Sequence, residues 1–142
     1  MTIPSECIEI TKNKKIVFKE NKSQIIFENQ NSLKVEKIKV DGCAIKEGIK
    51  CDYMIKIAKL DLEIYIELKG KDIDHALKQL ETTIKKLSEN YLKKTKICFI
   101  ISTRCPSMTA KIQNFKKKFK KNYNARLTIK NLNCSYKLIV DK

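Results

Sequence analysis

Several residue types are scarce in this chain of 142 residues, and each shortage excludes a class of protein. There is one histidine, His75, and the six cysteines include no C-x-x-C pair, which leaves little support for a zinc site. The chain has three glycines and two prolines while 42% of its residues are hydrophobic, so we expect a folded rather than a disordered protein. Its length suits one domain with a real core, spanning residues 1–142.

Long apolar runs are missing as well. No stretch approaches the roughly 18 residues needed to cross a membrane, and the start, MTIPSECIEI, lacks the basic and then apolar pattern of a signal peptide. We therefore expect an intracellular, cytoplasmic protein with no membrane partner. In that compartment cysteines stay reduced, and Cys98 and Cys134, which lie in or near apolar stretches, are interpreted as small core residues.

Acidic residues are scarce in the C-terminal part of the chain. The whole chain carries 31 Lys and Arg against 16 Asp and Glu, a net charge of +15. Residues 90–142 hold 14 of these cations and one acid, whereas residues 1–89 hold 17 cations and 15 acids. A basic field of this kind attracts phosphate backbones or anionic membranes. A lysine-rich composition also arises from a biased genome, and that alternative stays open for the charge taken alone.

Strands are predicted where apolar residues alternate with polar ones or form short runs. They are expected at residues 15–20, 24–29, 33–40, 50–58, 62–70 and 96–102, and the segments 125–130 and 135–140 supply one or two closing strands. The strands at 50–58 and 62–70 form an antiparallel pair around the turn KLD. The strand at 96–102 is a continuous apolar run, which is typical of a central strand covered on both faces.

Two amphipathic helices are predicted between these strands. Apolar residues recur at helical spacing from Ile73 to Tyr91, over about 18 residues, and Asp72 is a candidate N-cap. A second helix follows Pro106 and has a lysine-covered outer face. Its inner stripe consists of Met108, Ile112, Phe115 and Phe119. The order of elements indicates an α/β fold with a mixed central β-sheet flanked by α-helices.

Charged side chains interrupt the otherwise apolar strand LEIYIELKG near its end. Glu67 and Lys69 are two residues apart, so on a strand they point to the same face. Asp52 lies on the preceding strand, and a tight hairpin brings it beside Glu67. Two neighbouring carboxylates repel each other, more so where water is excluded, and a divalent cation removes the repulsion. The pattern predicts a Mg²⁺ or Mn²⁺ site formed by Asp52, Glu67 and the backbone carbonyl of Leu68.

Lys69 would sit beside such a cation, where it could orient or deprotonate a water molecule or stabilise negative charge on a phosphate. The E-x-K spacing alone carries little weight, because chance gives about three acid-x-Lys triplets in a chain of this composition. ENK at residues 20–22 is a second example. The context adds weight: Asp52 on the preceding strand, an apolar strand before Glu67, and a glycine and then a helix after Lys69.

The segments CDYMI, IYIELKG and HALKQL together resemble the core of the PD-(D/E)XK nuclease superfamily, which has the restriction-endonuclease-like fold. The resemblance covers roughly residues 33–103, and the longer run from VDGCAIKEG onwards is similar to small bacterial proteins of this type. It implies a restriction-endonuclease-like core in which Asp52 and Glu67 hold Mg²⁺. It also implies that Lys69 serves the hydrolytic water.

Two features depart from the superfamily pattern. The residue before Asp52 is Cys51 rather than proline, a difference that many members tolerate. Members also often draw a further acid from a helix before the sheet, and no such helix is predicted here. Asp41, in KVDGC, is the substitute that we predict as a third metal ligand, with Glu20 and Glu28 as weaker candidates.

Further polar residues are candidates for contacts with substrate. His75 and Gln79 are four apart, so they share one helix face, either at the mouth of the site or simply as polar surface residues. Arg104 follows the central strand and suits bidentate phosphate binding, or equally a solvated loop. A basic track for a nucleic-acid backbone is predicted from Arg104, Lys111, Lys116, Lys117, Lys118, Lys120 and Lys121. Aromatic residues are few, so base stacking and sequence readout are not indicated.

Taken together, these patterns predict a Mg²⁺-dependent endonuclease that hydrolyses phosphodiester bonds, with DNA the favoured substrate. One alternative is a catalytically inactive nucleic-acid-binding module on the same fold. Another is a basic subunit that binds an acidic protein partner. A homodimer is compatible with a nuclease that cuts two strands, but no residues identify an interface.

Overall fold

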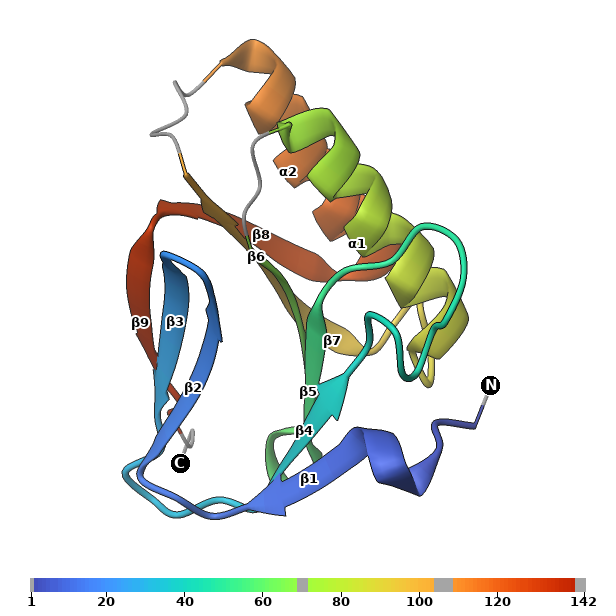
Figure 1. The fold of residues 1–142 in the computed structure, drawn as a ribbon. Coiled ribbons are helices and arrows are strands. Elements are labelled where there is room, and N and C mark those ends of the chain that lie inside the picture. The colour runs from blue at the N-terminus through green and yellow to red at the C-terminus, as the bar shows by residue number, and fades with distance from the viewer. Residues whose placement is uncertain (1, 69–71, 104–108, 140–142) are drawn as a thin grey trace.

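The computed structural model describes residues 2–68, 72–103 and 109–139 (Figure 1). Its larger sheet has six strands in the order β1-β4-β5-β6-β7-β8. These strands are β1 (Ile8–Thr11), β4 (Val35–Lys39), β5 (Tyr53–Ile57), β6 (Leu62–Leu68), β7 (Thr95–Ser102) and β8 (Ala125–Asn131). Pairing is antiparallel from β1 to β6 and parallel from β6 to β8, so the sheet is mixed as predicted.

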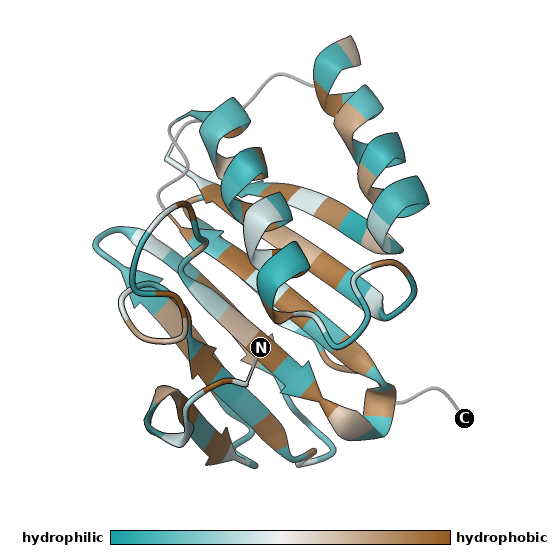
Figure 2. Ribbon diagram, turned by 90° about the vertical axis from the view of Figure 1, so that its right-hand side faces the viewer, coloured by the Kyte–Doolittle hydropathy of each residue, from teal (hydrophilic) through white to brown (hydrophobic). Residues whose placement is uncertain are grey.

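Two helices form the crossovers between the parallel strands and lie on the same face of the sheet (Figure 1). Helix α1 (Ile73–Leu87) connects β6 to β7, and α2 (Ala110–Tyr123) connects β7 to β8. As predicted, the Asp72 side chain caps α1 by accepting a hydrogen bond from the backbone N–H of His75. Figure 2 shows hydrophilic residues predominating along both helices, interrupted by short apolar bands. Each helix buries one apolar stripe against the sheet.

A second, three-stranded sheet covers the opposite face (Figure 1). It consists of β2 (Lys15–Glu20), β3 (Ser23–Glu28) and β9 (Asn133–Lys137). Strands β2 and β3, close to the predicted strands at 15–20 and 24–29, form an antiparallel hairpin, and β9 pairs parallel to β3. The large sheet therefore lies between two apolar layers. One layer packs under the helices around Tyr65 and Leu80, and the other packs between the sheets around Phe27 and Phe99.

Helix α1 ends at Leu87, earlier than the apolar spacing up to Tyr91 predicts. The cause is Glu63 on β6, whose side chain is fully buried. Its Oε1 accepts a hydrogen bond from the Ser88 hydroxyl at 2.6 Å, and its Oε2 accepts one from the Glu89 N–H at 3.0 Å. These bonds draw the chain away from the helix axis, and Tyr91 is left exposed beyond the helix.

The expectation that the cysteines are reduced is wrong for Cys7 and Cys43, which form a disulfide across 36 residues of sequence. Cys7 ends the short 3-10 helix η1 (Ser5–Cys7), and Cys43 lies in the turn after β4. The remaining described cysteines are free: Cys51 and Cys98 are buried and Cys134 is half-buried. For Cys98 and Cys134 this agrees with the interpretation as core or near-core residues.

Strands β4 and β5 are shorter than the strands predicted at 33–40 and 50–58, whereas β6 begins at Leu62 as predicted. Strand β1 was not predicted at all. The predicted strand end at Lys69 and Gly70, and the second helix's predicted start after Pro106, lie outside the described residues, as does Met108. A second short 3-10 helix, η2 (Ala58–Leu60), occupies the turn between β5 and β6.

Candidate metal centre

The β5–β6 hairpin brings Asp52 opposite Glu67. Tyr53 pairs with Ile66 in the antiparallel ladder, so the residue before Tyr53 faces the residue after Ile66. The backbone N–H of Asp52 donates to the Ile66 carbonyl at 3.1 Å, which extends the ladder to this position. Met54 and Tyr65, two residues from Asp52 and Glu67, both belong to the core under the helices. By strand alternation, Asp52 and Glu67 point to that same helix-covered face.

Both carboxyl groups are withdrawn from water at this strand end. The Asp52 side chain is half-buried, and its Oδ2 accepts a hydrogen bond from the Leu68 N–H at 2.8 Å. Glu67 is 6% exposed, and its carboxyl lies within hydrogen-bonding reach of the Asp52 carboxyl. The Oε1 atom of Glu67 is buried without a hydrogen-bond partner among the described residues. A buried hydrogen-bond acceptor without a partner destabilises the folded state unless a donor or a cation lies beside it.

The acid–base properties of the pair follow from this geometry. Burial, followed by the charge of Asp52, raises the pKa of Glu67 to about 9. The pKa of Asp52 is raised as well, chiefly by burial, although the hydrogen bond from the Leu68 N–H opposes the rise. Like charges in contact away from water cannot both form readily. At neutral pH, without a cation, the pair therefore retains a proton.

Two further acids border the pair. Asp41 follows β4, and its backbone N–H donates to the Asp52 carbonyl at 3.2 Å. Glu20 ends β2, and its Oε1 accepts a hydrogen bond from the Tyr53 hydroxyl at 3.2 Å. The charges of Glu20 and Asp41 both raise the pKa of Asp52, so they lie within electrostatic range of the pair. We call Glu20, Asp41, Asp52 and Glu67 the acidic cluster.

Of the predicted additional ligands, Asp41 and Glu20 thus border the pair, whereas Glu28 does not. Glu28 pairs with Lys15 at the end of the β2–β3 hairpin opposite Glu20, so its candidacy as a ligand was wrong. The Asp41 side chain is largely exposed and lies 3.7 Å from the Lys50 ammonium. Lys69 and Arg104 lie outside the described residues, and their roles stay predictions.

Helix α1 fixes the backbone directly before Asp52. The Gln79 side-chain amide donates to the Lys50 carbonyl at 2.9 Å. The Thr83 hydroxyl accepts from the Cys51 N–H and donates to the Gln79 carbonyl, each at 2.8 Å. Gln79 was predicted at the mouth of the site, but its amide is bound to backbone, which makes it a positioning residue for the strand that carries Asp52.

Sequence reasoning missed Thr83. The available signal was a polar residue that falls inside the apolar stripe of α1, where its side chain is fully buried. Cys51, in place of the proline of many superfamily members, is also fully buried, and burial raises the pKa of its thiol to about 12. It packs in the apolar core under the helices. His75 is exposed in the first turn of α1.

The predicted basic track on α2 is partly engaged within the protein. Lys111 pairs with Asp74 at 2.8 Å, and Lys118 pairs with Glu81 at 3.3 Å, both across to α1. Lys120 donates to the Asn124 side chain of its own helix end. No ion pair within the described residues involves Lys116, Lys117 or Lys121. These three lysines are the members of the track that remain available to a phosphate backbone.

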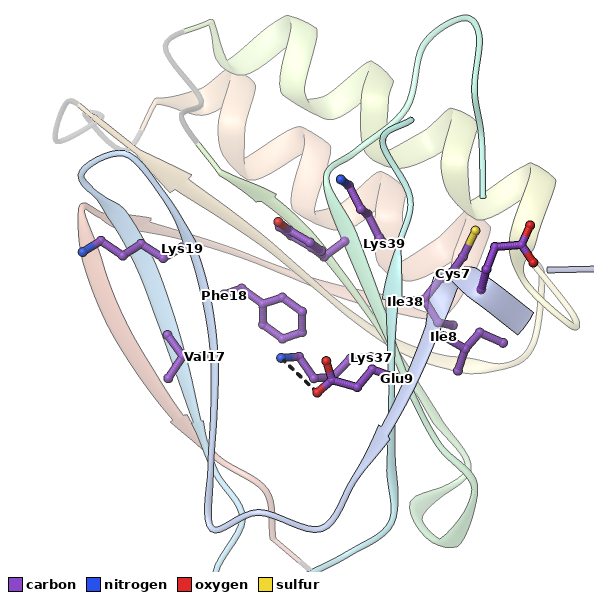
Figure 3. A pocket seen from close by; sticks show the side chains of 11 residues that line it. Cys7, Ile8, Glu9, Val17, Phe18, Lys19, Lys37, Ile38 and Lys39 are labelled. Carbon is purple, nitrogen blue, oxygen red and sulfur yellow. Dashed lines mark ion pairs between the residues drawn. The ribbon is translucent and has the colours of Figure 1, made fainter. Parts of the chain in front are cut away.

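A cleft of about 370 Å³ opens between the two sheets (Figure 3). Its walls come from η1, β1, β2 and β4, and Tyr53, the neighbour of Asp52, also lines it. Phe18 lies inside, with its ring 4.9 Å from that of Tyr53. Lys37 reaches over the Phe18 ring and forms an ion pair with Glu9 at 3.9 Å. Glu20, Asp41, Asp52 and Glu67 are not among the residues that line this cleft.

The donor set fits a hard cation with an incomplete protein shell. Within residues 2–68, 72–103 and 109–139, no group of three or more His, Cys, Asp or Glu side chains is arranged to hold a metal ion. Asp52 and Glu67 supply two carboxylates, which matches Mg²⁺, because this ion is usually bound through one or two carboxylates and keeps several waters. The orphaned Oε1 of Glu67 supplies a free ligand atom at the same place.

Comparisons with known proteins give no family to this chain: no protein-family model, curated protein or solved structure matches it. Within the described parts of the chain, no helix has the length and apolar character needed to cross a bilayer.

Proposed function

We propose that the protein is a Mg²⁺-dependent nuclease that hydrolyses phosphodiester bonds, with DNA as its substrate. The observation that carries the proposal is the contact between the Asp52 carboxyl and the buried carboxyl of Glu67, whose Oε1 has no hydrogen-bond partner among the described residues. Protein cores rarely place two acids together away from water without a compensating charge. A divalent cation supplies that charge, and it also promotes hydrolysis of a phosphodiester by polarising the phosphoryl group and activating a water molecule.

The arrangement of elements supports a restriction-endonuclease-like core. Strands β4, β5 and β6 form an antiparallel meander, α1 crosses over, and β7 returns parallel to β6. Asp52 precedes the second strand of this unit and Glu67 lies near the end of the third. The same order underlies the resemblance of CDYMI and IYIELKG to the PD-(D/E)XK nucleases.

In this proposal, different residues of the chain bind the cation, position its ligands and contact the phosphate backbone. Asp52 and Glu67 hold the cation, which supplies positive charge at the phosphoryl oxygens and lowers the pKa of a water molecule. The Leu68 N–H orients the Asp52 carboxyl, and Gln79 and Thr83 fix the backbone before it. Lys69 orients or deprotonates the attacking water, or stabilises the negative charge that develops on the phosphate. The backbone carbonyl of Leu68, the preceding residue, is a further candidate ligand of the cation. The exposed lysines of α2 hold the phosphate backbone by charge rather than by base contacts.

Cleavage of DNA by matched variants tests the proposal. We expect wild-type protein to cut plasmid or single-stranded DNA in Mg²⁺ or Mn²⁺, and Glu67→Gln and Lys69→Ala to lose at least about a hundredfold in rate, as removal of a key electrostatic group does. Glu28→Gln, at the other end of the β2–β3 hairpin, is the matched control and should cut like wild type.

Three other outcomes separate the alternatives. If Glu67→Gln and Lys69→Ala cut as fast as wild type, the assigned site is wrong. Salt-sensitive DNA binding without cleavage would instead identify a binding module on this fold. Absence of DNA binding at about 50 mM salt, where phosphate contacts are strong, would leave a basic subunit that binds an acidic partner.

A further inference from the structure

The Cys7–Cys43 disulfide encloses a defined part of the fold. The covalent ring runs from the end of η1 to the turn after β4 and contains β1, β2, β3 and β4. Glu20 and Asp41, the two outer acids of the acidic cluster, lie inside this ring. Asp52 and Glu67, the central pair, lie outside it on the β5–β6 hairpin. The cross-link therefore tethers directly the segment that carries the outer acids, and the central pair lies outside the covalent ring.

Cys43 belongs to the same tight turn as Asp41. The Cys43 N–H donates to the Val40 carbonyl at 3.1 Å, and the Ala44 N–H donates to the Lys39 carbonyl at 3.1 Å. The Val40 and Asp41 N–H groups both donate to the Asp52 carbonyl, at 3.0 and 3.2 Å. A tether on Cys43 thus restrains a turn that touches the backbone of Asp52 directly.

The other cysteine of the disulfide, Cys7, belongs to the N-terminal segment. Cys7 is 5% exposed and lies at the rim of the cleft, where β1 begins (Figure 3). Strand β1 is an edge strand, held to β4 by four residue pairs from Ile8 to Thr11. Without the cross-link, this short edge and the turn at residues 41–45 are held by β1–β4 pairing and by the packing of Ile8 and Ala44 against the core under the helices. Such segments are the first to open in a folded protein.

We propose that the Cys7–Cys43 disulfide is a redox-sensitive clamp that sets how tightly the acidic cluster holds a divalent cation. Cys43 is half-buried whereas Cys7 is 5% exposed, so Cys43 is the end of the disulfide at which a small dithiol attacks. A thiolate of the dithiol attacks the Cys43 Sγ, the S–S bond breaks, and its electron pair leaves on the Cys7 Sγ, which takes up a proton. The second thiol of the reductant then displaces Cys43 as a thiol. Two electrons and two protons pass to the protein, and the reductant becomes a disulfide.

The inference rests on the proposed metal site, so its test measures the clamp in two ways. The first is hydrogen exchange of the backbone at residues 39–52, which needs no metal. The second is Mn²⁺ affinity by titration calorimetry. Both are measured on oxidised protein, on protein reduced with a phosphine and desalted under nitrogen, and on the variant with Cys7→Ser and Cys43→Ser. Cys134→Ser, which removes a free thiol from β9, is the control in both redox states.

We expect reduction, and equally the double variant, to speed exchange at residues 41–50 and to weaken Mn²⁺ binding about tenfold, the size of effect seen when groups supporting metal ligands are disturbed. The reductant should change neither quantity in the double variant. If the double variant folds poorly, the comparison of oxidised with reduced wild-type protein still tests the proposal. Equal exchange and equal Mn²⁺ affinity in oxidised and reduced protein would overturn the clamp while leaving the nuclease proposal intact. Absence of Mn²⁺ binding in both states would overturn the proposed metal site, and the clamp's effect on metal affinity with it.

Discussion

Replacing Glu67 with glutamine should change how stability depends on pH. Glutamine has nearly the same shape as glutamate but cannot ionise, so it removes the repulsion with Asp52 and keeps the packing. The wild-type pair is held at a strand end where Glu67 is 6% exposed and its Oε1 has no partner among the described residues. The free energy of unfolding without metal should therefore record the cost of ionising this carboxyl.

The sign of the effect follows from the raised pKa of Glu67, about 9 in the folded protein against an ordinary value of 4.5. Between these values the folded state holds a proton that the unfolded state has lost, so the free energy of unfolding decreases as pH rises. One pKa unit corresponds to about 1.4 kcal/mol. From pH 5 to pH 8 the loss is on the order of 2 to 4 kcal/mol, the upper figure being reached if Glu67 alone carries the shared proton.

Urea unfolding in the presence of a chelator measures this loss. Wild-type protein should lose stability steadily from pH 5 to pH 8, Glu67→Gln should lose much less, and the m-values of both should agree. Glu28→Gln, away from the cluster, should keep the wild-type pH dependence. Millimolar Mg²⁺ should restore wild-type stability at pH 8 and leave Glu67→Gln nearly unchanged, because a ligand of the folded state stabilises it by mass action. Parallel pH profiles for wild type and Glu67→Gln would refute the reasoning.

Two further substitutions test what surrounds the site. Thr83→Val leaves the Cys51 N–H without its buried acceptor, so urea unfolding should show a loss of about 1 to 3 kcal/mol; Mn²⁺ affinity should fall as well, and unchanged values of both would show that Thr83 does not position the strand. Lys96→Met removes a buried ammonium that donates to the carbonyls of Asn90, Lys94 and Tyr123. Thermal unfolding should show that the free energy of unfolding falls by about 3 kcal/mol, because the three carbonyls are left unpaired. Mn²⁺ affinity should stay at the wild-type value. A weaker Mn²⁺ affinity would mean that this end of the sheet also supports the site.

The sequence was most informative where local pattern decides structure. Alternation and a short turn predicted the β5–β6 hairpin, and with it the meeting of Asp52 and Glu67. Helical spacing predicted both helices, and Asp72 was recognisable as a cap because its side chain serves a backbone N–H three residues on. Each of these features depends on residues close together in the chain.

Features that depend on distant partners were beyond the sequence. The pairing of β9 with β3 joins residues more than a hundred positions apart, so no local pattern shows that a second sheet forms. The disulfide between Cys7 and Cys43 is of the same kind, since cysteine spacing does not reveal which sulfurs meet. The end of α1 at Leu87 was missed because it depends on the buried carboxyl of Glu63, which lies on a different strand.

Titration of the protein with Mn²⁺ at pH 7, in buffers of different ionisation enthalpy, tests the central claim most directly. The account predicts that one ion binds per chain, that about one proton is released from the Asp52–Glu67 pair on binding, and that both effects disappear in Glu67→Gln. Binding of Mn²⁺ to Glu67→Gln with wild-type affinity, or binding to wild type without proton release, would contradict it.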